Sequence, residues 1–88
     1  MYKIYITKTF ERRLKTFVKK HPERESEIKN RLDMLIHNPF VPELKTHKLS
    51  VALKKQFAVW LTYEYRILFV LKKDKIYLTN IGSHDEIY

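Results

Sequence analysis

The spacing of the apolar residues changes partway along the chain, and this change constrains the fold more than any other feature. Up to residue 36 the apolar side chains recur at helical intervals, in two stripes. From residue 46 onward they alternate, which is typical of half-buried strands, and residues 2–7 alternate as well. The helical stripes are Phe10, Leu14, Phe17 and Val18, then Ile28, Leu32, Leu35 and Ile36. The later strand candidates are 46–50, 57–63, 65–71 and 76–81.

Capping residues and prolines place the ends of the two helices. Thr7 or Thr9 can cap the first helix, Pro22 suits the first turn of the second, and Asn38-Pro39 stops it. A connection as short as His21-Pro22 predicts two antiparallel helices. We therefore expect one α+β domain over residues 1–88, in the order β-α-α-β-β-β-β. A helical hairpin would pack on one face of a mostly antiparallel sheet and leave the other face open for function.

The charge balance limits the kind of partner. The chain has 18 Lys and Arg against 10 Asp and Glu, a formal net charge of +8 over 88 residues. Such an excess attracts polyanions, because binding releases their counterions. The pattern is compatible with a solubilising surface, with a nucleic-acid ligand and with an acidic protein partner.

Other classes of protein and site are disfavoured by what the sequence lacks. Without cysteine there can be no disulfide, thiolate nucleophile or cysteine metal site. No apolar run approaches the roughly 20 residues that cross a bilayer, and residues 1–7 have no signal-peptide block. The four histidines do not have H-x-x-x-H spacing, and no phosphate loop is present. We expect a cytoplasmic protein with no membrane partner, metal or small-molecule cofactor.

His84 is the first candidate for chemistry. It follows the last predicted strand and lies near Gly82, the only glycine, whose freedom at positive φ would turn the chain there. Histidine titrates near neutrality and can give or take a proton. On spacing alone, an exposed tail histidine is equally compatible.

Arg66 and His47 are the next candidates. Arg66 interrupts an apolar strand, where a charge is costly unless it meets water, a partner, a ligand or a carboxylate such as Glu64. His47 lies in a short predicted strand and, taken alone, fits an ordinary strand residue slightly better than a catalytic one. Basic residues near aromatic ones suit single-stranded RNA, although most strand aromatics belong to a core. The residues in this group are Lys54, Lys55, Trp60, Tyr63, Tyr65 and Tyr88.

Together, these residue types favour one reaction. A base can remove the proton of a ribose 2′-OH, a cation can neutralise the phosphorane-like charge, and an acid can protonate the leaving 5′ oxygen. The reaction needs no metal and cannot cleave DNA, which has no 2′-OH. Histidine, arginine, lysine and tyrosine side chains therefore suit transesterification of RNA.

The element order and four runs of sequence resemble the RelE/ParE superfamily of type II toxins, in particular the RelE/StbE and YafQ-like branch. The runs are THKLS at 46–50, LKK at 53–55, LTYEYRILF at 61–69 and IGSHDEIY at 81–88. The resemblance covers almost the whole chain. It implies a ribosome-dependent mRNA endonuclease with a cognate acidic antitoxin that wraps the basic surface.

The resemblance also implies roles for individual residues. His84 matches the C-terminal histidine of proton transfer, and His47 matches the histidine of the H-x-L segment. Arg66 matches the strand arginine that stabilises the phosphate, with help here from Lys54. The remaining expected RNA or rRNA contacts are Lys48 and Lys55 to the backbone and Tyr88 to a base.

The chain departs from the family pattern at four positions. YafQ itself has a further histidine and an aspartate on the third strand, where this chain has Leu61 and Tyr65. Many relatives have glycine in place of Val51 and Lys55. These departures concern the acid–base assignment more than the class. Because the fold is shared, two other functions remain open: a ParE-like inhibitor of DNA gyrase without nuclease activity, and a non-toxic relative that only binds an antitoxin.

Overall fold

A five-stranded sheet forms the centre of the computed structural model, which describes residues 1–49 and 55–87. The strands lie in the order β1-β5-β4-β3-β2. β1 is parallel to β5, and the other neighbouring pairs are antiparallel. The strands are β1 (Lys3–Ile6), β2 (His47–Lys48), β3 (Gln56–Trp60), β4 (Tyr65–Lys72) and β5 (Lys75–Ser83). The predicted order of elements and the mostly antiparallel sheet are confirmed.

The helices begin and end close to the residues that the sequence indicates. Thr7 caps α1 (Lys8–Lys20), because its Oγ1 accepts a hydrogen bond from the Phe10 N–H at 3.2 Å. Pro22 begins the short 3₁₀ helix η1 (Pro22–Arg24), and α2 (Glu25–His37) follows it. The second helix thus starts one 3₁₀ turn later than predicted. The remaining helices are η2 (Pro42–Leu44) and α3 (His84–Ile87).

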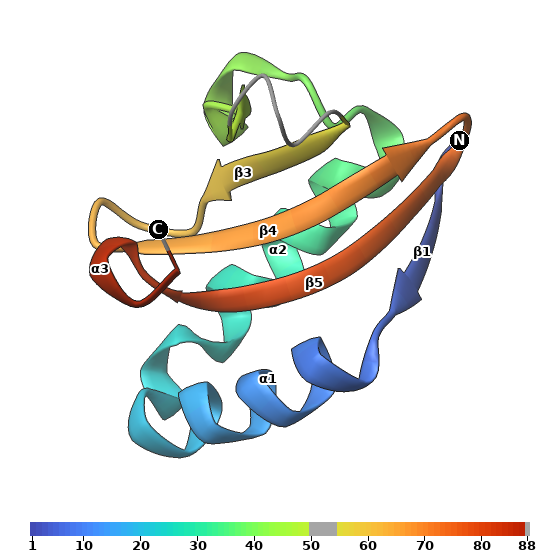
Figure 1. Cartoon of the computed structure of the whole chain (residues 1–88). Helices are drawn as coiled ribbons and strands as arrows, with labels where there is room; N and C mark the ends of the chain where they lie inside the picture. Colours follow the sequence, from blue (N-terminus) through green and yellow to red (C-terminus); the bar gives the residue numbers. More distant parts are fainter. Residues whose placement is uncertain (50–54, 88) are drawn as a thin grey trace.

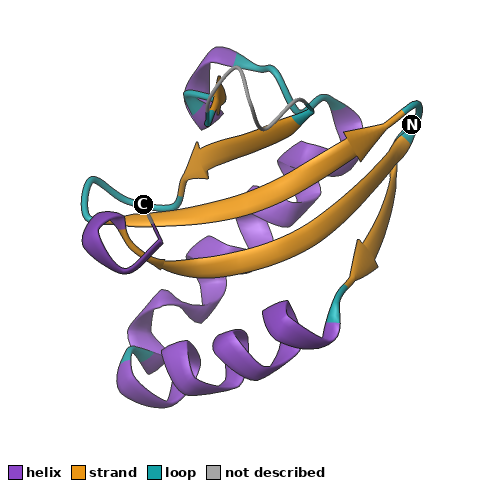
Figure 2. Ribbon diagram, in the orientation of Figure 1, coloured by secondary structure: helices purple, strands orange, loops and turns teal. Residues whose placement is uncertain are grey.

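The chain reverses direction at η1, so that α1 and α2 both lie on one side of the sheet (Figures 1 and 2). Their apolar stripes meet one face of the central strands in a single core. Phe10 and Leu35 are fully buried there. The core residues are Phe10, Phe17, Ile28, Leu35, Leu44, Val59, Leu61, Ile67, Phe69, Ile76, Leu78 and Ile81.

The sheet face opposite α1 and α2 carries the candidate site. Because side chains alternate along a strand, Val59 and Ile67 face the core while Trp60 and Arg66 face the other way. Trp60 pairs with Arg66, and Arg66 pairs with Gly82, so these residues form one row across β3, β4 and β5. The face that the sequence predicts to be left open for function is therefore the one that carries Trp60 and Arg66.

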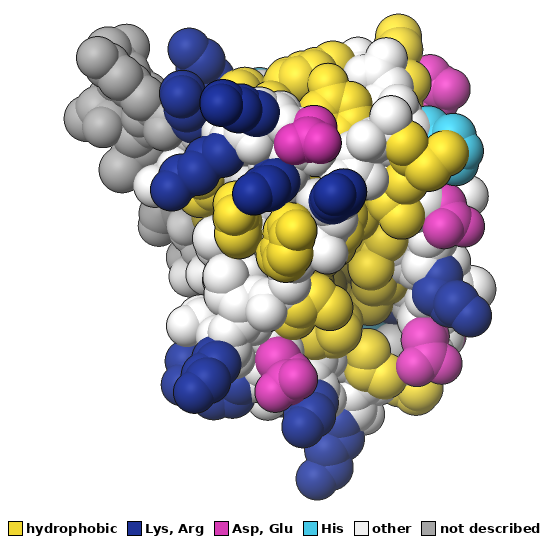
Figure 3. Space-filling model, turned by 90° about the vertical axis from the view of Figure 1, so that its right-hand side faces the viewer, with side chains coloured by type: hydrophobic (Ala, Val, Ile, Leu, Met, Phe, Trp, Pro, Cys, Tyr) yellow, Lys and Arg dark blue, Asp and Glu magenta, His cyan; other side chains and the backbone are white. Residues whose placement is uncertain are grey.

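Basic side chains also gather at the far end of the sheet, around the β4–β5 turn. Figure 3 views the molecule from this end and shows Lys and Arg side chains close to hydrophobic ones. The turn contributes Lys72, Lys73 and Lys75, with Asp74 between them. Among the described residues, no helix is both long and apolar enough to cross a membrane.

Candidate active site

Gly82 lies inside β5 and does not have a positive φ. The prediction that it turns the chain in the left-handed region is therefore wrong. Its missing side chain matters for a different reason. A Cβ here would lie 3.1 Å from Arg13 Nη2 and 3.3 Å from both Glu86 Oε1 and Ile87 Cγ2. Glycine thus lets α1 and α3 approach the backbone of β5 closely.

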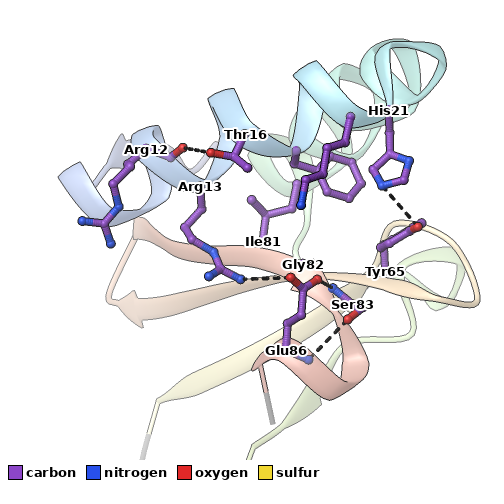
Figure 4. Close-up of a pocket in the computed structure, with 11 residues that line it drawn as sticks. Arg12, Arg13, Thr16, His21, Tyr65, Ile81, Gly82, Ser83 and Glu86 are labelled. Carbon is purple, nitrogen blue, oxygen red and sulfur yellow. Dashed lines mark hydrogen bonds and ion pairs between the residues drawn. The ribbon is translucent and has the colours of Figure 1, made fainter.

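The short helix α3 is held by a reciprocal cap between Ser83 and Glu86 (Figure 4). The Ser83 N–H donates to Glu86 Oε1 at 2.9 Å, and the Glu86 N–H donates to Ser83 Oγ at 3.3 Å. The hydrogen bonds from Ser83, with the charges of Arg13 and Lys20, hold the pKa of Glu86 below its ordinary value. The S-x-x-E spacing of this cap is visible in the sequence, and it fixes the orientation of the residue that follows Ser83.

That residue, His84, is placed at the first position of α3. Its backbone N–H donates to the Glu64 carbonyl at 3.1 Å, which ties α3 to the loop between β3 and β4. The side chain is 62% exposed, and its Nδ1 lies 3.7 Å from Asp85 Oδ1. His84 thus has a fixed backbone and an imidazole that solvent and substrate can reach.

Arg66 lies beside His84 and is 7% exposed. Its Nη1 donates to the carbonyls of Thr62, Tyr63 and Tyr65 at 2.8, 2.7 and 3.2 Å. Among the described residues Arg66 forms no ion pair, so the salt bridge to Glu64 considered from the sequence is not made. Its Nε is buried without a hydrogen-bond partner within the same part of the chain. A guanidinium that makes no ion pair can bind an anionic ligand, although Glu64 and Asp85 lie close to it.

A hollow of about 560 Å³ brings these groups together. Both His84 and Arg66 line it, so an imidazole and a buried guanidinium share one space. A phosphate in this hollow could accept charge-assisted hydrogen bonds while an imidazole exchanges a proton with it. The residues that line the hollow are Tyr63, Glu64, Arg66, Ser83, His84 and Asp85.

Trp60 supports Arg66 from the neighbouring strand. The Arg66 guanidinium carbon lies 4.3 Å from the Trp60 ring centroid, and Lys45 Nζ lies 4.8 Å from it. The indole therefore contacts two cations. In the sequence, Trp60 stands out only as an aromatic neighbour of basic residues, and Lys45 is not among the candidates. The alternating side chains of β3 and β4 could have predicted that Trp60 and Arg66 share a face. Lys45 follows η2, and no periodic pattern in the sequence predicts where its side chain lies.

His47 and Lys48 lie on the outer strand β2, and both are exposed. His47 pairs with Ala58, which is two residues from Trp60 on the same side of β3. His47 Nδ1 lies 3.3 Å from the Lys45 carbonyl. Strand spacings place the backbones of His47 and Arg66 roughly 12 Å apart. His47 thus shares the sheet face with Arg66 but does not line the hollow that Arg66 and His84 share.

Lys55 lies away from this group. It precedes β3, at the end of that strand opposite to Trp60, and lines a separate hollow with residues of the β4–β5 turn. Its φ of 65° is in the left-handed region, which glycine adopts most readily. Lys54 and Tyr88, the other two predicted site residues, lie outside the described residues.

His21 and His37 have the structural roles expected of residues at helix ends. His21 Nε2 lies 3.4 Å from the Tyr65 hydroxyl, and its ring packs against Phe17 and Tyr65. His37 Nδ1 lies 2.9 Å from the Asp33 carbonyl. In the described ranges, no three His, Asp or Glu side chains come together as a metal site would require.

Comparison with known proteins identifies relatives over the whole chain. The model of the family described as "Bacterial toxin of type II toxin-antitoxin system, YafQ" matches residues 2–88. The chain also superposes on YafQ in the crystal structure of the Escherichia coli DinJ–YafQ complex, with a TM-score of 0.86 and 19% identity over 100% of this chain and 99% of that one.

Two further structures share the fold. YafQ from E. coli strain BL21(DE3) gives a TM-score of 0.83 and 17% identity, over 100% of this chain and 99% of that one. A metal-bound toxin from Helicobacter pylori gives a TM-score of 0.75 and 26% identity, over 100% of both chains. A comparison with curated protein sequences finds no match. Because the family model spans nearly every residue, the chain belongs to the YafQ family of toxins of type II toxin–antitoxin systems.

Proposed function

We propose that this toxin is a metal-independent endoribonuclease that cleaves mRNA on the ribosome and so inhibits translation. The observation that carries the proposal is the shared hollow of His84 and Arg66, in which a reachable imidazole lies next to a buried arginine. Membership of the YafQ family supports a nuclease toxin. The reaction, the ribosome and the message are inferences from the site residues and from the resemblance.

The proposed reaction is an internal displacement. The ribose 2′ oxygen attacks the adjacent phosphorus, the bond to the 5′ oxygen breaks, and the products are a 2′,3′-cyclic phosphate and a 5′-hydroxyl. Arg66 stabilises the charge that develops on the phosphate oxygens. Because the three carbonyls already hold Nη1, the guanidinium needs little reorganisation when the substrate arrives.

His84 and His47 are the proposed proton-transfer groups. One removes the proton from the 2′-OH, and the other protonates the leaving 5′ oxygen. In an in-line displacement these two oxygens lie on opposite sides of the phosphorus, so the acid and the base must be separated by the reacting group. The separation between His47 and the hollow on the same sheet face is compatible with this requirement.

The remaining predicted residues complete the RNA contacts. Lys48, next to His47, would hold the RNA or rRNA backbone, and Lys55 would do so further along the sheet. Lys54 is proposed as a helper of Arg66, and the resemblance suggests Tyr88 as a stacking residue. We also propose that a cognate acidic antitoxin covers the basic surface. The net charge of +8 and the crystallised complex of the relative YafQ with DinJ support this partner.

Translation-coupled cleavage of a reporter mRNA tests the proposal. Wild type and His37→Ala, a control that removes a histidine remote from the hollow, should cleave alike, whereas His84→Ala should lose about 10²- to 10⁴-fold in rate. Equal cleavage by His84→Ala and wild type would remove His84 from the mechanism. An intact message combined with inhibited gyrase supercoiling would favour the ParE-like alternative.

A further inference from the structure

Three lysines face one another across neighbouring strands at the far end of the sheet. Lys3 in β1 pairs with Lys75 in β5, and Lys75 pairs with Lys72 in β4. All three side chains are exposed, and none forms an ion pair within residues 1–49 and 55–87. Like charges directly opposite each other destabilise a sheet. A row of this kind costs stability in the isolated protein, and a bound polyanion would offset that cost.

The next row on the same sheet face is aromatic. Tyr5 and Tyr77 pair across β1 and β5, and their rings stack with centroids 5.2 Å apart and planes 20° apart. Tyr5 is 43% exposed. Lys72 Nζ lies 5.9 Å from the Tyr77 ring, so Tyr77 contacts Tyr5 and approaches Lys72. The stack thus presents Tyr5 to solvent beside the lysines.

A hollow of about 400 Å³ joins these two rows. Its lining is Lys55, Lys72, Lys73, Lys75 and Tyr77, with no carboxylate among them. Asp74, the acidic residue of the same turn, does not line the hollow, and its backbone carbonyl accepts a hydrogen bond from the Lys3 N–H at 2.8 Å. Figure 3 shows basic and hydrophobic side chains gathered at this end, with an acidic side chain among them. Lysines around a stacked aromatic pair provide charge for phosphates and a flat surface for bases.

We propose that the lysine–tyrosine surface, defined as Lys3, Lys72, Lys75, Tyr5 and Tyr77, is a docking site for single-stranded RNA. The exposed tyrosine stack favours RNA over an acidic peptide, because unpaired bases stack on aromatic rings. Stacking also requires splayed bases, which single strands provide. This inference rests on the proposed function and extends it to a second site.

The two sites lie on one face of one strand. Residues 66, 68, 70 and 72 alternate to the same side of β4, so Lys72 is on the face of Arg66. They are six positions apart, which corresponds to roughly 20 Å along the strand. An RNA strand that reaches both sites would have its scissile phosphate at Arg66 and a more distant segment at the lysine–tyrosine surface.

Fluorescence anisotropy with the whole protein tests the site. The probe is a fluorescein-labelled single-stranded RNA of about 12 nucleotides, methylated at every 2′ oxygen so that it cannot be cleaved. The Lys72→Ala/Lys75→Ala variant should weaken binding and reduce the slope of log affinity against log salt by about 1.4. The matched control is Lys15→Ala/Lys19→Ala, two exposed lysines of α1, which should retain the wild-type slope.

Tyrosine variants test the stacking part of the proposal. Tyr5→Leu should weaken binding about 5- to 100-fold without changing the salt slope, and Tyr5→Phe should bind like wild type. Equal losses in the two lysine pairs would overturn the site, because only general charge would then be acting. The site would also be overturned if the Lys72 and Lys75 variant kept its RNA affinity but lost binding to polyglutamate.

Binding and cleavage measurements together distinguish the docking site from the proposed nuclease activity. In a His84→Ala background that has lost cleavage, the Lys72→Ala/Lys75→Ala pair should still weaken binding of the methylated RNA. A protein that binds RNA through the lysine–tyrosine surface but cleaves no message would retain the docking site and contradict only the proposed function. A protein that cleaves normally with both lysines replaced and with unchanged RNA affinity would contradict only the docking site.

Discussion

The guanidinium of Arg66 lies over the indole of Trp60, 4.3 Å from the ring centroid, and the two residues face each other directly across β3 and β4. The cation–π contact offsets part of the free-energy cost of burying the charge of Arg66 and holds its side chain in place. The indole supports one face of the guanidinium, while three carbonyls of residues 62–65 hold one of its nitrogens. The same residue thus closes the loop between β3 and β4 and presents positive charge beside His84.

The variant Arg66→Lys tests the contribution of the planar guanidinium group separately from that of the positive charge. Lysine keeps the positive charge but cannot reach three carbonyls with the same planar geometry. We therefore expect the free energy of unfolding of the variant to be about 1–3 kcal/mol lower than that of wild type. Urea denaturation measures this. Lys45→Ala, which removes an exposed cation from the same indole, should change stability by less than about 0.5 kcal/mol. Wild-type stability of Arg66→Lys would show that the carbonyl contacts contribute nothing.

The cap between Ser83 and Glu86 predicts a local effect in α3. Ser83→Ala removes the side-chain acceptor of the Glu86 N–H, and a lost N-cap costs about 1 kcal/mol. Because α3 has only four residues, it can fray without global unfolding. Amide hydrogen exchange in α3 should therefore accelerate about fivefold at neutral pH. Unchanged exchange rates would mean that α3 does not depend on its cap.

The same cap depends on pH through Glu86, whose pKa is lowered in the folded protein by its hydrogen bonds with Ser83. A lowered carboxyl pKa contributes stability that is present above the unfolded value, near pH 4.3. That contribution is lost as the pH falls through the folded value. Exchange in α3 should thus rise on acidification in wild type and change less in Glu86→Gln. Equal pH profiles would contradict the assignment.

Gly82 predicts a graded response to side-chain size. In Gly82→Ala the new Cβ meets two flexible side-chain ends, Arg13 Nη2 and Glu86 Oε1, along with Ile87 Cγ2. Small shifts can accommodate it, so we expect a stability change below about 1 kcal/mol. Gly82→Leu cannot be accommodated so easily, and overpacking should cost about 1–3 kcal/mol. Urea denaturation of both variants checks the difference, and a Gly82→Leu protein as stable as wild type would contradict it.

The contact between Tyr65 and His21 tests whether a histidine and a tyrosine outside the hollow take part in cleavage. His21 packs between α1 and β4, with Nε2 3.4 Å from the Tyr65 hydroxyl, and does not line the hollow of Arg66. Tyr65→Phe should lower stability by about 1 kcal/mol or less and leave mRNA cleavage intact. Loss of cleavage in Tyr65→Phe, with stability retained, would move the active site toward α1.

The sequence predicted the fold well because its two apolar periods are unambiguous. The stripes through Phe10 and Leu35 gave the helices, and the alternation around Val59 and Ile67 gave the central strands. Arg66 was identified because a charge inside an apolar strand requires a partner. The three carbonyls that hold it were not foreseeable, since they depend on how residues 62–65 bend between β3 and β4.

Other parts of the site depended on the path of the chain in space. Lys55 follows Lys54 in sequence, yet β3 carries the chain roughly 17 Å before Trp60 is reached, so Lys55 belongs to the opposite end of the sheet. Gly82 was expected to provide a turn and instead provides space for Arg13 and Glu86. Steric space of this kind arises from tertiary packing, and neither the amino-acid composition nor the spacing of apolar residues predicts it.

The chemistry of the cleaved ends tests the central claim most directly. Message cut during translation by wild-type protein should carry 2′,3′-cyclic phosphate and 5′-hydroxyl ends, because a ribose 2′ oxygen is the proposed nucleophile. His84→Ala should produce these ends about 10²- to 10⁴-fold more slowly, and a 2′-deoxy nucleotide at the cut position should block them. Products with 5′-phosphate ends, or cleavage next to the 2′-deoxy nucleotide, would contradict the proposed roles of His84 and Arg66.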